Sequence, residues 1–226
     1  MNRSDTDIEL LLDELEETKR GIENTIDESG FVRFPNDFTF FSYGNDNELN
    51  DKYLCYTPNL ETIKENKKED LVIVSGIGAT NAPTMGTMSE ILKIIDAQKK
   101  TGIYTHFIIN DFGSINARSI GVKKALQLTD QYKSFVRKMG FDETNGRICT
   151  HNDIDHARTF SLVARMIRIS DFSGNTEATD KTYDRLGLRG RDFSVLIDHV
   201  YTATDVLLPI VKDQKKGVVV ICGLDE

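Results

Sequence analysis

The sequence predicts an α/β fold built on a parallel β-sheet. Residues 71–78 (LVIVSGIG) begin with a run of apolar, β-branched side chains, as expected of a strand that is buried on both faces. Residues 87–102 then place apolar side chains at helical spacing and end at Gly102, a common C-terminal stop. Residues 106–111 (HFIIND) follow as a second buried strand. Together they make a βαβ unit, whose crossover is nearly always right-handed.

A long helical segment separates this unit from the last strand. The sequence between about 119 and 208 is mainly helical, and residues 217–223 (GVVVICG) predict a final buried strand. We therefore expect a sheet that is interrupted by a helical insertion over about 119–208 and then resumed.

The first 70 residues differ in character from the rest. Residues 6–28 place Ile and Leu near helical spacing, which predicts an amphipathic helix. Residues 29–70 contain short β-like runs that Asn, Asp and Gly interrupt, and they end in a charged connector. We expect an N-terminal helix and β appendage over residues 1–70 and a core domain over residues 71–226.

Composition excludes several classes of protein. No run approaches the roughly 18 apolar residues of a membrane-spanning helix, and the N-terminus is acidic where a signal peptide would be basic. The cysteines, Cys55, Cys149 and Cys222, are odd in number and have no CxxC spacing, which fits a reducing cytoplasm. A net charge of -8 argues against bulk electrostatic binding of nucleic acid, although a local basic patch is compatible with it.

Ligands of open parallel sheets bind beyond the carboxyl ends of the strands. Here those positions carry SGIGATNAPTMGT, NDFGSINAR and GLDE. Gly76, Gly78 and Gly86 would let a backbone approach a phosphate or base, and the next helix offers free N–H groups. The spacing is neither GxGxxG nor a P-loop. On the glycines alone, a nucleotide site and an ordinary strand-to-helix turn both stay open.

The order of several motifs indicates a family. VSGIGATNAPTMGTM resembles the first signature of the class I aminoacyl-tRNA synthetases, with Thr84-Met85-Gly86-Thr87 in the place of the HIGH tetrapeptide. Four later stretches resemble the tryptophanyl and tyrosyl branch in the same order: THFIINDFGSINAR, CTHNDIDHARTFSLVARMIRISDFSG, LIDHVYTATDVLLPIVKD and GVVVICGLDE. The resemblance covers about residues 71–226 and implies a Rossmann-like nucleotide-binding core.

The resemblance implies a site for ATP, with Mg²⁺ as its counter-ion. Gly86 would lie under the adenine, and the hydroxyls of Thr84 and Thr87 would donate hydrogen bonds to phosphate oxygens. Alternatively, Thr84 is only the N-cap of the following helix, and the two roles are compatible. Asp225 would accept from the ribose, unless it is only a frayed end. The other expected ATP-binding residues are Gly76, Gly78, Pro83 and Gly223.

The resemblance also implies an amino-acid site. Asp205, on a predicted helix with apolar neighbours, would accept an indole N–H or a phenol O–H, or else it is an ordinary helix-surface acid. Asn110 and Asp111 would be polar groups of the same pocket, although turn formation accounts for them as well.

The HNDIDH stretch raises the alternative of a metal site. His151, Asp153, Asp155 and His156 are all possible ligands, but their spacing fits no familiar zinc pattern. We therefore interpret this stretch as a loop and helix start, with Asp153 or Asp155 as the cap, and expect no metal there.

Two signatures of the family have no counterpart in the sequence. These are the lysine-rich KMSKS loop and the helical domain that reads the anticodon. We therefore expect either a trimmed catalytic fragment or a natural short relative. The expected activity is the ATP-dependent activation of an amino acid, tryptophan first and tyrosine second, with tRNA as a possible acceptor. The alternative is a non-catalytic module that keeps the pocket. The resemblance further implies a cytoplasmic homodimer that pairs through the helical insertion.

Overall fold

The computed structural model describes residues 66–116, 120–168 and 193–222, together with scattered positions between residues 12 and 65. The chain divides into two compact units, the larger of which spans Asn66–Cys222. Each unit is described by itself.

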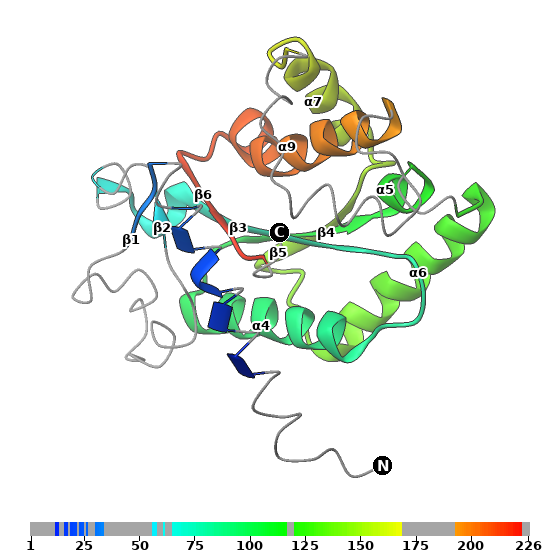
Figure 1. The fold of residues 1–226 in the computed structure, drawn as a ribbon, viewed down its shortest axis with the longest axis horizontal. Helices are drawn as coiled ribbons and strands as arrows, with labels where there is room; N and C mark the ends of the chain where they lie inside the picture. The colour runs from blue at the N-terminus through cyan, green and yellow to red at the C-terminus, as the bar shows by residue number, and fades with distance from the viewer. Residues whose placement is uncertain are drawn as a thin grey trace. The chain divides into compact units, whose positions relative to one another are not determined.

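The larger unit is built on a four-stranded parallel sheet (Figure 1), which confirms the predicted fold class. A single 3-10 turn, η1 (Lys68–Asp70), leads into it. The strand order is β5-β4-β3-β6, and every neighbouring pair is parallel. The strands are β3 (Leu71–Gly78), β4 (Thr105–Asn110), β5 (Gly146–Thr150) and β6 (Gly217–Val220).

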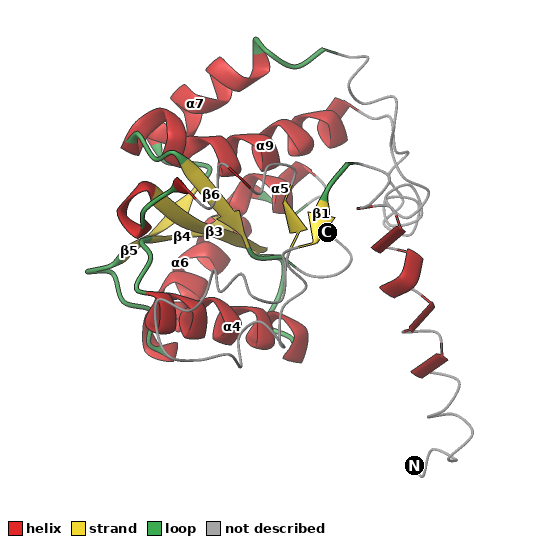
Figure 2. Ribbon diagram, turned by 90° about the vertical axis from the view of Figure 1, so that its left-hand side faces the viewer, coloured by secondary structure: helices red, strands yellow, loops and turns green. Residues whose placement is uncertain are grey.

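Helices cover both faces of this sheet (Figures 1 and 2). On one face lie α4 (Met85–Thr101) and α6 (Val122–Met139), and on the other lie α5 (Asp111–Asn116), α7 (Ile154–Ala164) and α9 (Phe193–Asp213). Both faces of β3 are consequently buried, which is why its sequence is apolar without alternation. The result is a three-layer arrangement with the sheet in the middle.

The predicted βαβ unit is confirmed. The helix α4 begins after Thr84 and ends at Gly102, whose backbone is left-handed with φ of 59° and donates to the Gln98 carbonyl. The glycine is needed there because other residues rarely adopt that conformation. The second strand ends one residue earlier than predicted, and Asp111 opens α5 instead.

One strand was missed in the segment predicted to be mainly helical. Residues Gly146–Thr150 form β5, which pairs with β4 and extends the sheet, so the expected helical insertion over about 119–208 is not continuous. The strand is short and carries the polar residues Arg147 and Thr150, so it lacks the apolar signal of β3. Gly146 allows the close approach, since a Cβ atom there would lie 2.5 Å from the Thr105 carbonyl oxygen.

The last strand differs from its prediction in burial. β6 lies at the edge of the sheet, beside β3, and its residues are half-buried or exposed. Val220 is 48 % exposed. The run of valines in GVVVICG predicts a strand buried on both faces, but apolar content alone does not distinguish an edge strand from a central one.

The smaller unit contains a short antiparallel pair, β1 (Val32–Arg33) with β2 (Tyr56–Thr57). The described positions between Leu12 and Ile26 are helical, as predicted for residues 6–28. The β-like run at 37–43 lies outside the described residues. Among the described residues, no helix is both long and apolar enough to cross a membrane.

Candidate functional site

The two threonines expected to contact phosphate lie at the start of α4, with Thr84 at the N-cap and Thr87 in the first turn. Thr84 is the N-cap of α4, and its hydroxyl oxygen accepts a hydrogen bond of 3.2 Å from the Thr87 backbone N–H. The two hydroxyl oxygens lie 3.0 Å apart. The structure therefore confirms the capping role of Thr84, and contact with phosphate stays a prediction.

The glycines of this region differ in the space around them. At Gly76 a Cβ atom would lie 3.2 Å from the Ile108 carbonyl oxygen, so the close pairing of β3 and β4 accounts for this glycine. At Gly86 the nearest atom to an added Cβ is the Thr84 hydroxyl at 3.7 Å, and at Gly78 it is the Thr80 methyl, also at 3.7 Å. Gly86 is exposed, so the structure leaves open space beside it.

A recess of about 490 Å³ adjoins the same loop. It is lined by Thr80, Asn81, Ile120, Gly121 and Lys124. The loop is held to α6 because the Tyr132 hydroxyl donates a hydrogen bond of 2.9 Å to the Asn81 carbonyl. Lys124 brings a positive charge to the recess, close to the amino ends of α4 and α6, where helix dipoles favour anions.

The turn from β4 into α5 places two predicted polar residues. The Asn110 side-chain oxygen accepts from the Gly113 N–H, and the Asn110 carbonyl accepts from the Ser114 hydroxyl at 2.9 Å. The Asn110 side chain also acts on the carboxylate of Asp198 on α9, whose pKa it lowers against the larger effect of burial. Turn formation therefore accounts for Asn110 in part, and the link to α9 is a second role.

Asp111 is buried at the start of α5, at 1 % exposure. Its Oδ1 atom accepts backbone N–H groups from Phe112 and His151, both at 3.1 Å, whereas its Oδ2 atom is buried without a hydrogen-bond partner. The pKa of the Asp111 carboxyl lies above its ordinary value, because burial raises it more than the nearby His151 and the N–H donors lower it. The unpartnered oxygen makes this carboxylate a candidate acceptor for a ligand.

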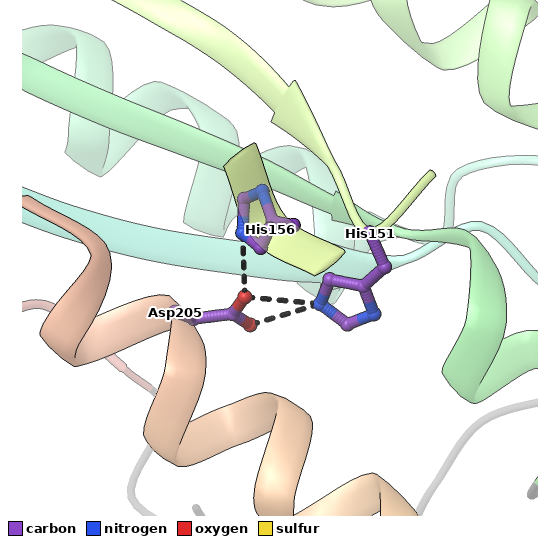
Figure 3. A group of neighbouring side chains, drawn as sticks. All are labelled: His151, His156 and Asp205. Carbon is purple, nitrogen blue, oxygen red and sulfur yellow. Dashed lines mark hydrogen bonds and ion pairs between the residues drawn. The ribbon is translucent and has the colours of Figure 1, made fainter. Parts of the chain in front are cut away.

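Asp205 meets two histidines at the carboxyl edge of the sheet (Figure 3). The His151 Nε2 atom lies 3.0 Å from Oδ1 and 3.1 Å from Oδ2 of Asp205, and the His156 Nε2 atom lies 3.0 Å from Oδ1. His151 follows β5 directly, His156 lies on the first turn of α7, and Asp205 lies on α9. The predicted carboxylate therefore has partners that the sequence analysis had placed in a loop and helix start.

Aromatic rings enclose this group. The Tyr201 ring stacks on His151, with centroids 4.4 Å apart and planes 8° apart, and contacts Phe160 at 4.5 Å and Phe112 at 5.6 Å. Asp198, Tyr201 and Asp205 lie at three- and four-residue spacing, which places them on one face of α9. The Asp205 side chain is 16 % exposed, so solvent reaches the group from one side.

Two opposing effects act on the charge of Asp205. Burial raises the pKa of its carboxyl, but the hydrogen bonds from His151 and His156 together outweigh it, so the pKa lies below the ordinary value. Asp205 is therefore an ionised carboxylate that accepts from both rings.

The remaining acids of the HNDIDH stretch have other partners. Asp153 occupies the N-cap position of α7, but its carboxylate accepts from the Thr150 N–H at 2.9 Å rather than from the helix. Asp155 forms an ion pair with Lys212 on α9. The predicted cap is thus correct in position for Asp153, and neither acid joins the histidine group.

Replacing Asp111 by asparagine is expected to raise the free energy of unfolding at neutral pH by about 1–2 kcal/mol, because the amide leaves no buried charge. A carboxyl whose folded-state pKa is raised stabilises the fold below its unfolded pKa and loses that contribution as pH rises through the folded pKa. The advantage of the variant should therefore shrink in acid. Urea unfolding of the wild type and the variant at about pH 7 and about pH 4 measures the difference in their free energies of unfolding. An equal difference at the two pH values would contradict the expected effect of burial on the Asp111 carboxylate.

Comparison with known proteins identifies structures of the same fold but no family at the level of sequence. No protein-family model matches the chain, and no curated protein matches it. Among solved structures, the tryptophanyl-tRNA synthetase homologue from Entamoeba histolytica matches 90 % of this chain and 55 % of its own, at 13 % identity and a TM-score of 0.66. Tryptophanyl-tRNA synthetase from Giardia lamblia matches 86 % of this chain over 49 % of the enzyme's own length, at 16 % identity and a TM-score of 0.59.

A tyrosyl-tRNA synthetase also matches. The enzyme from Archaeoglobus fulgidus, in complex with L-tyrosine, covers 71 % of this chain and 48 % of its own, at 14 % identity and a TM-score of 0.51. The chain has the fold of a class I tryptophanyl- or tyrosyl-tRNA synthetase. It spans about half the length of the synthetases it matches.

The predicted residues reach the carboxyl edge of the synthetase fold from both faces of the sheet. Thr84, Thr87 and Gly86 lie at the start of α4, on one face, and Asp205 lies on α9, on the other (Figure 1). Asn110 and Asp111 join the Asp205 side of the site through Asp198 and His151. Pro83 lies half-buried in the loop before α4. Gly223 and Asp225 lie outside the described residues.

Several residues of this site were not predicted from the sequence. Asp198 and Tyr201 were not singled out, although their spacing from Asp205 on one helix was a readable signal. Lys124 had no such signal, because only the fold brings α6 beside the β3–α4 loop.

Proposed function

We propose that this chain binds ATP and an amino acid at the carboxyl edge of the sheet and joins them as an aminoacyl-adenylate. Tryptophan is the first candidate amino acid and tyrosine the second. The observation that carries the proposal is a set of three carboxylates beside aromatic rings at the edge of a synthetase fold: Asp111, which is buried, and Asp198 and Asp205, which are half-buried.

The carboxylates suit an amino acid. The Asp111 Oδ2 and Asp198 Oδ1 atoms are buried without hydrogen-bond partners, and an ammonium group supplies the donors and the positive charge that such oxygens need. The Asp205 Oδ2 atom accepts one hydrogen bond, whereas Oδ1 accepts two. Oδ2 thus keeps capacity for an indole N–H or a phenol O–H of the substrate.

The opposite side of the edge suits ATP. The open space at Gly86 would receive the adenine, and the hydroxyls of Thr84 and Thr87 and the ammonium of Lys124 would contact phosphate oxygens, with Mg²⁺ as counter-ion. A carboxylate oxygen of the amino acid would attack the α-phosphorus of ATP, and the bond from that phosphorus to the bridging oxygen of the pyrophosphate would break, which releases pyrophosphate. The protein contributes positioning and charge stabilisation. Gly76, Gly78 and Pro83 would shape the loop, and Gly223 with Asp225 would contact the ribose.

A non-catalytic binding module is the second candidate. The observation in its favour is that Asp205 is already engaged by two histidines, which leaves less of its capacity for a substrate. Such a module would bind the ligands without forming pyrophosphate.

The test measures binding first and turnover second. An adenylate analogue present at about 100 times its dissociation constant should stabilise the fold by roughly 2.7 kcal/mol, which thermal unfolding detects as a shift of several degrees. Analogues of tryptophan, tyrosine and an aliphatic amino acid identify the side chain. Exchange of labelled pyrophosphate into ATP then distinguishes the two candidates. An adenylate-forming enzyme catalyses this exchange, and a non-catalytic module does not. If no analogue shifts the midpoint, both candidates fail.

The proposal includes tRNA as the eventual acceptor and a homodimer as the assembly. The dimer is expected to pair through the segment between about 120 and 200, which contains α6 and α7. Light scattering of the purified chain should give twice the 25.5 kDa chain mass. A single chain mass at micromolar concentration would contradict the expected dimer and leave the adenylate proposal unaffected.

A further inference from the structure

We propose that His151, His156 and Asp205 form a binding site for a divalent transition-metal ion, with zinc as the ion that these ligands fit best. Among the residues that the structure describes, this is the group of three histidine, cysteine or acidic side chains whose ligand atoms all lie within 4.8 Å of one another. The site goes beyond the proposed function, because it requires neither ATP nor an amino acid. It also departs from the expectation of no metal at the HNDIDH stretch, since that expectation rested on the sequence spacing and did not include Asp205.

The distances fit a shared ion. Zinc binds imidazole nitrogen and carboxylate oxygen at about 2.0–2.2 Å. Each histidine nitrogen lies 3.0 Å from the Asp205 Oδ1 atom, and an ion about 2.05 Å from both atoms of such a pair holds them at an angle of about 95°. The three ligand atoms lie within 4.8 Å of one another, and a shared ion needs every pair within about 4.1 Å, so binding draws the two histidine nitrogens closer together. Both imidazoles approach through Nε2 (Figure 3), and three protein ligands leave the fourth position open.

The ligands are held in place before an ion arrives. The His151 and His156 side chains are 0 % and 1 % exposed, and Tyr201 stacks on the first ring. They come from the end of β5 and the first turn of α7, and Asp205 comes from α9, so the packed α7 and α9 fix their separation. Asp205 retains 16 % exposure, which provides a route of entry.

The surroundings supply acceptors for the protons that binding displaces. Because Asp205 accepts from both rings, each Nε2 carries its proton in the metal-free protein. Metal binding needs that lone pair, so the proton moves to Nδ1. The His151 Nδ1 atom is buried without a partner, and Asp111 and Asp198, which both act electrostatically on His151, keep buried oxygens without partners. Histidine ligands of zinc usually donate the outer N–H to a carboxylate, a carbonyl or water, and in the metal-free protein the His151 Nδ1 atom has no such partner within hydrogen-bond distance.

A second histidine and aspartate pair in the same unit shows the contrast. The His106 Nε2 atom lies 3.1 Å from the Asp213 Oδ2 atom, at an angle that makes no hydrogen bond. The Arg147 guanidinium lies 3.5 Å from the same oxygen. The arginine repels a cation, and no third ligand is present among the described residues. His106 is therefore a matched control.

Zinc titration of the chelator-treated full chain, without ATP or amino acid, tests the proposal. Calorimetry should give one ion per chain, and affinity for zinc should fall at least about 100-fold in His156→Gln and in Asp205→Asn. Loss of a group that only hydrogen-bonds to a metal ligand already costs about 10–100-fold. His106→Gln should bind as the wild type does. Circular dichroism first establishes that each variant is folded.

An NMR measurement on the wild type keeps the proposal falsifiable if the variants do not fold. One equivalent of zinc should shift the ring nitrogens of two of the four histidines and leave the other two unchanged. Unshifted rings, or calorimetric binding that survives in both folded variants, would overturn it. Because no substrate is present, this outcome is independent of the adenylate test.

Discussion

Replacing Asp205 by alanine is expected to lower the free energy of unfolding by about 2–4 kcal/mol. The substitution removes the acceptor of both His151 and His156 and leaves two buried Nε2 atoms without a partner. The loss should be largest near neutral pH, where the carboxylate is ionised. The sign follows from its lowered pKa: the contribution is present above the unfolded pKa and disappears as pH falls through the folded pKa. Urea unfolding over a pH series measures it.

The matched control for this substitution is Asp155→Ala. Asp155 also pairs with a cation, Lys212, but both side chains are about one-third exposed, so the change should cost less than about 1 kcal/mol. If Asp205→Ala costs no more than this control, the carboxylate is solvated in solution and the histidine group does not form. Both the hydrogen-bonded group and the metal site would then be wrong.

Replacing Gly86 by valine is expected to abolish binding of an adenylate analogue while leaving the fold as stable as before. In the free protein a Cβ atom at this position makes only an ordinary contact of 3.7 Å, and the residue is exposed. Valine costs less than glycine in a helix, so stability should stay within about 0.5 kcal/mol or rise. With the analogue, the branched side chain would occupy the space proposed for adenine, and the stabilisation of roughly 2.7 kcal/mol should disappear.

Ser89→Val is the control for this experiment. Ser89 is exposed on the same helix, one turn further from the loop, so the same side chain is introduced without entering the proposed nucleotide site. This variant should retain the shift with the analogue. If Gly86→Val retains it too, the adenine lies elsewhere and the role assigned to the Thr84–Thr87 segment fails.

The central part of the fold was predictable because its local signals agree. In β3 an unbroken apolar run matches burial on both faces, and α4 has a threonine cap at one end and a left-handed glycine at the other. The strand β5 was not predictable in the same way. Its position next to β4 depends on the fit of Gly146 against the Thr105 carbonyl, a contact between distant segments that no local pattern encodes.

The candidate site was predictable only in pieces. Asn110, Asp111 and Asp205 follow from the strand ends and the family resemblance, and the structure links them. The grouping of Asp205 with the histidines was not predictable. His151 and His156 have no zinc-like spacing, and their third partner lies 54 and 49 residues away in sequence, on a helix that only tertiary packing brings near.

The strand order also sets when the sheet is completed during synthesis. β3 ends at Gly78, but β6, its partner at the outer edge, begins at Gly217. At about 5–20 residues per second, the ribosome needs roughly 7–28 s to make the chain between them. During that interval one row of backbone N–H and C=O groups on this apolar central strand has no partner strand. Polysomes, which hold growing copies close together, are therefore where this protein is most exposed to intermolecular strand pairing.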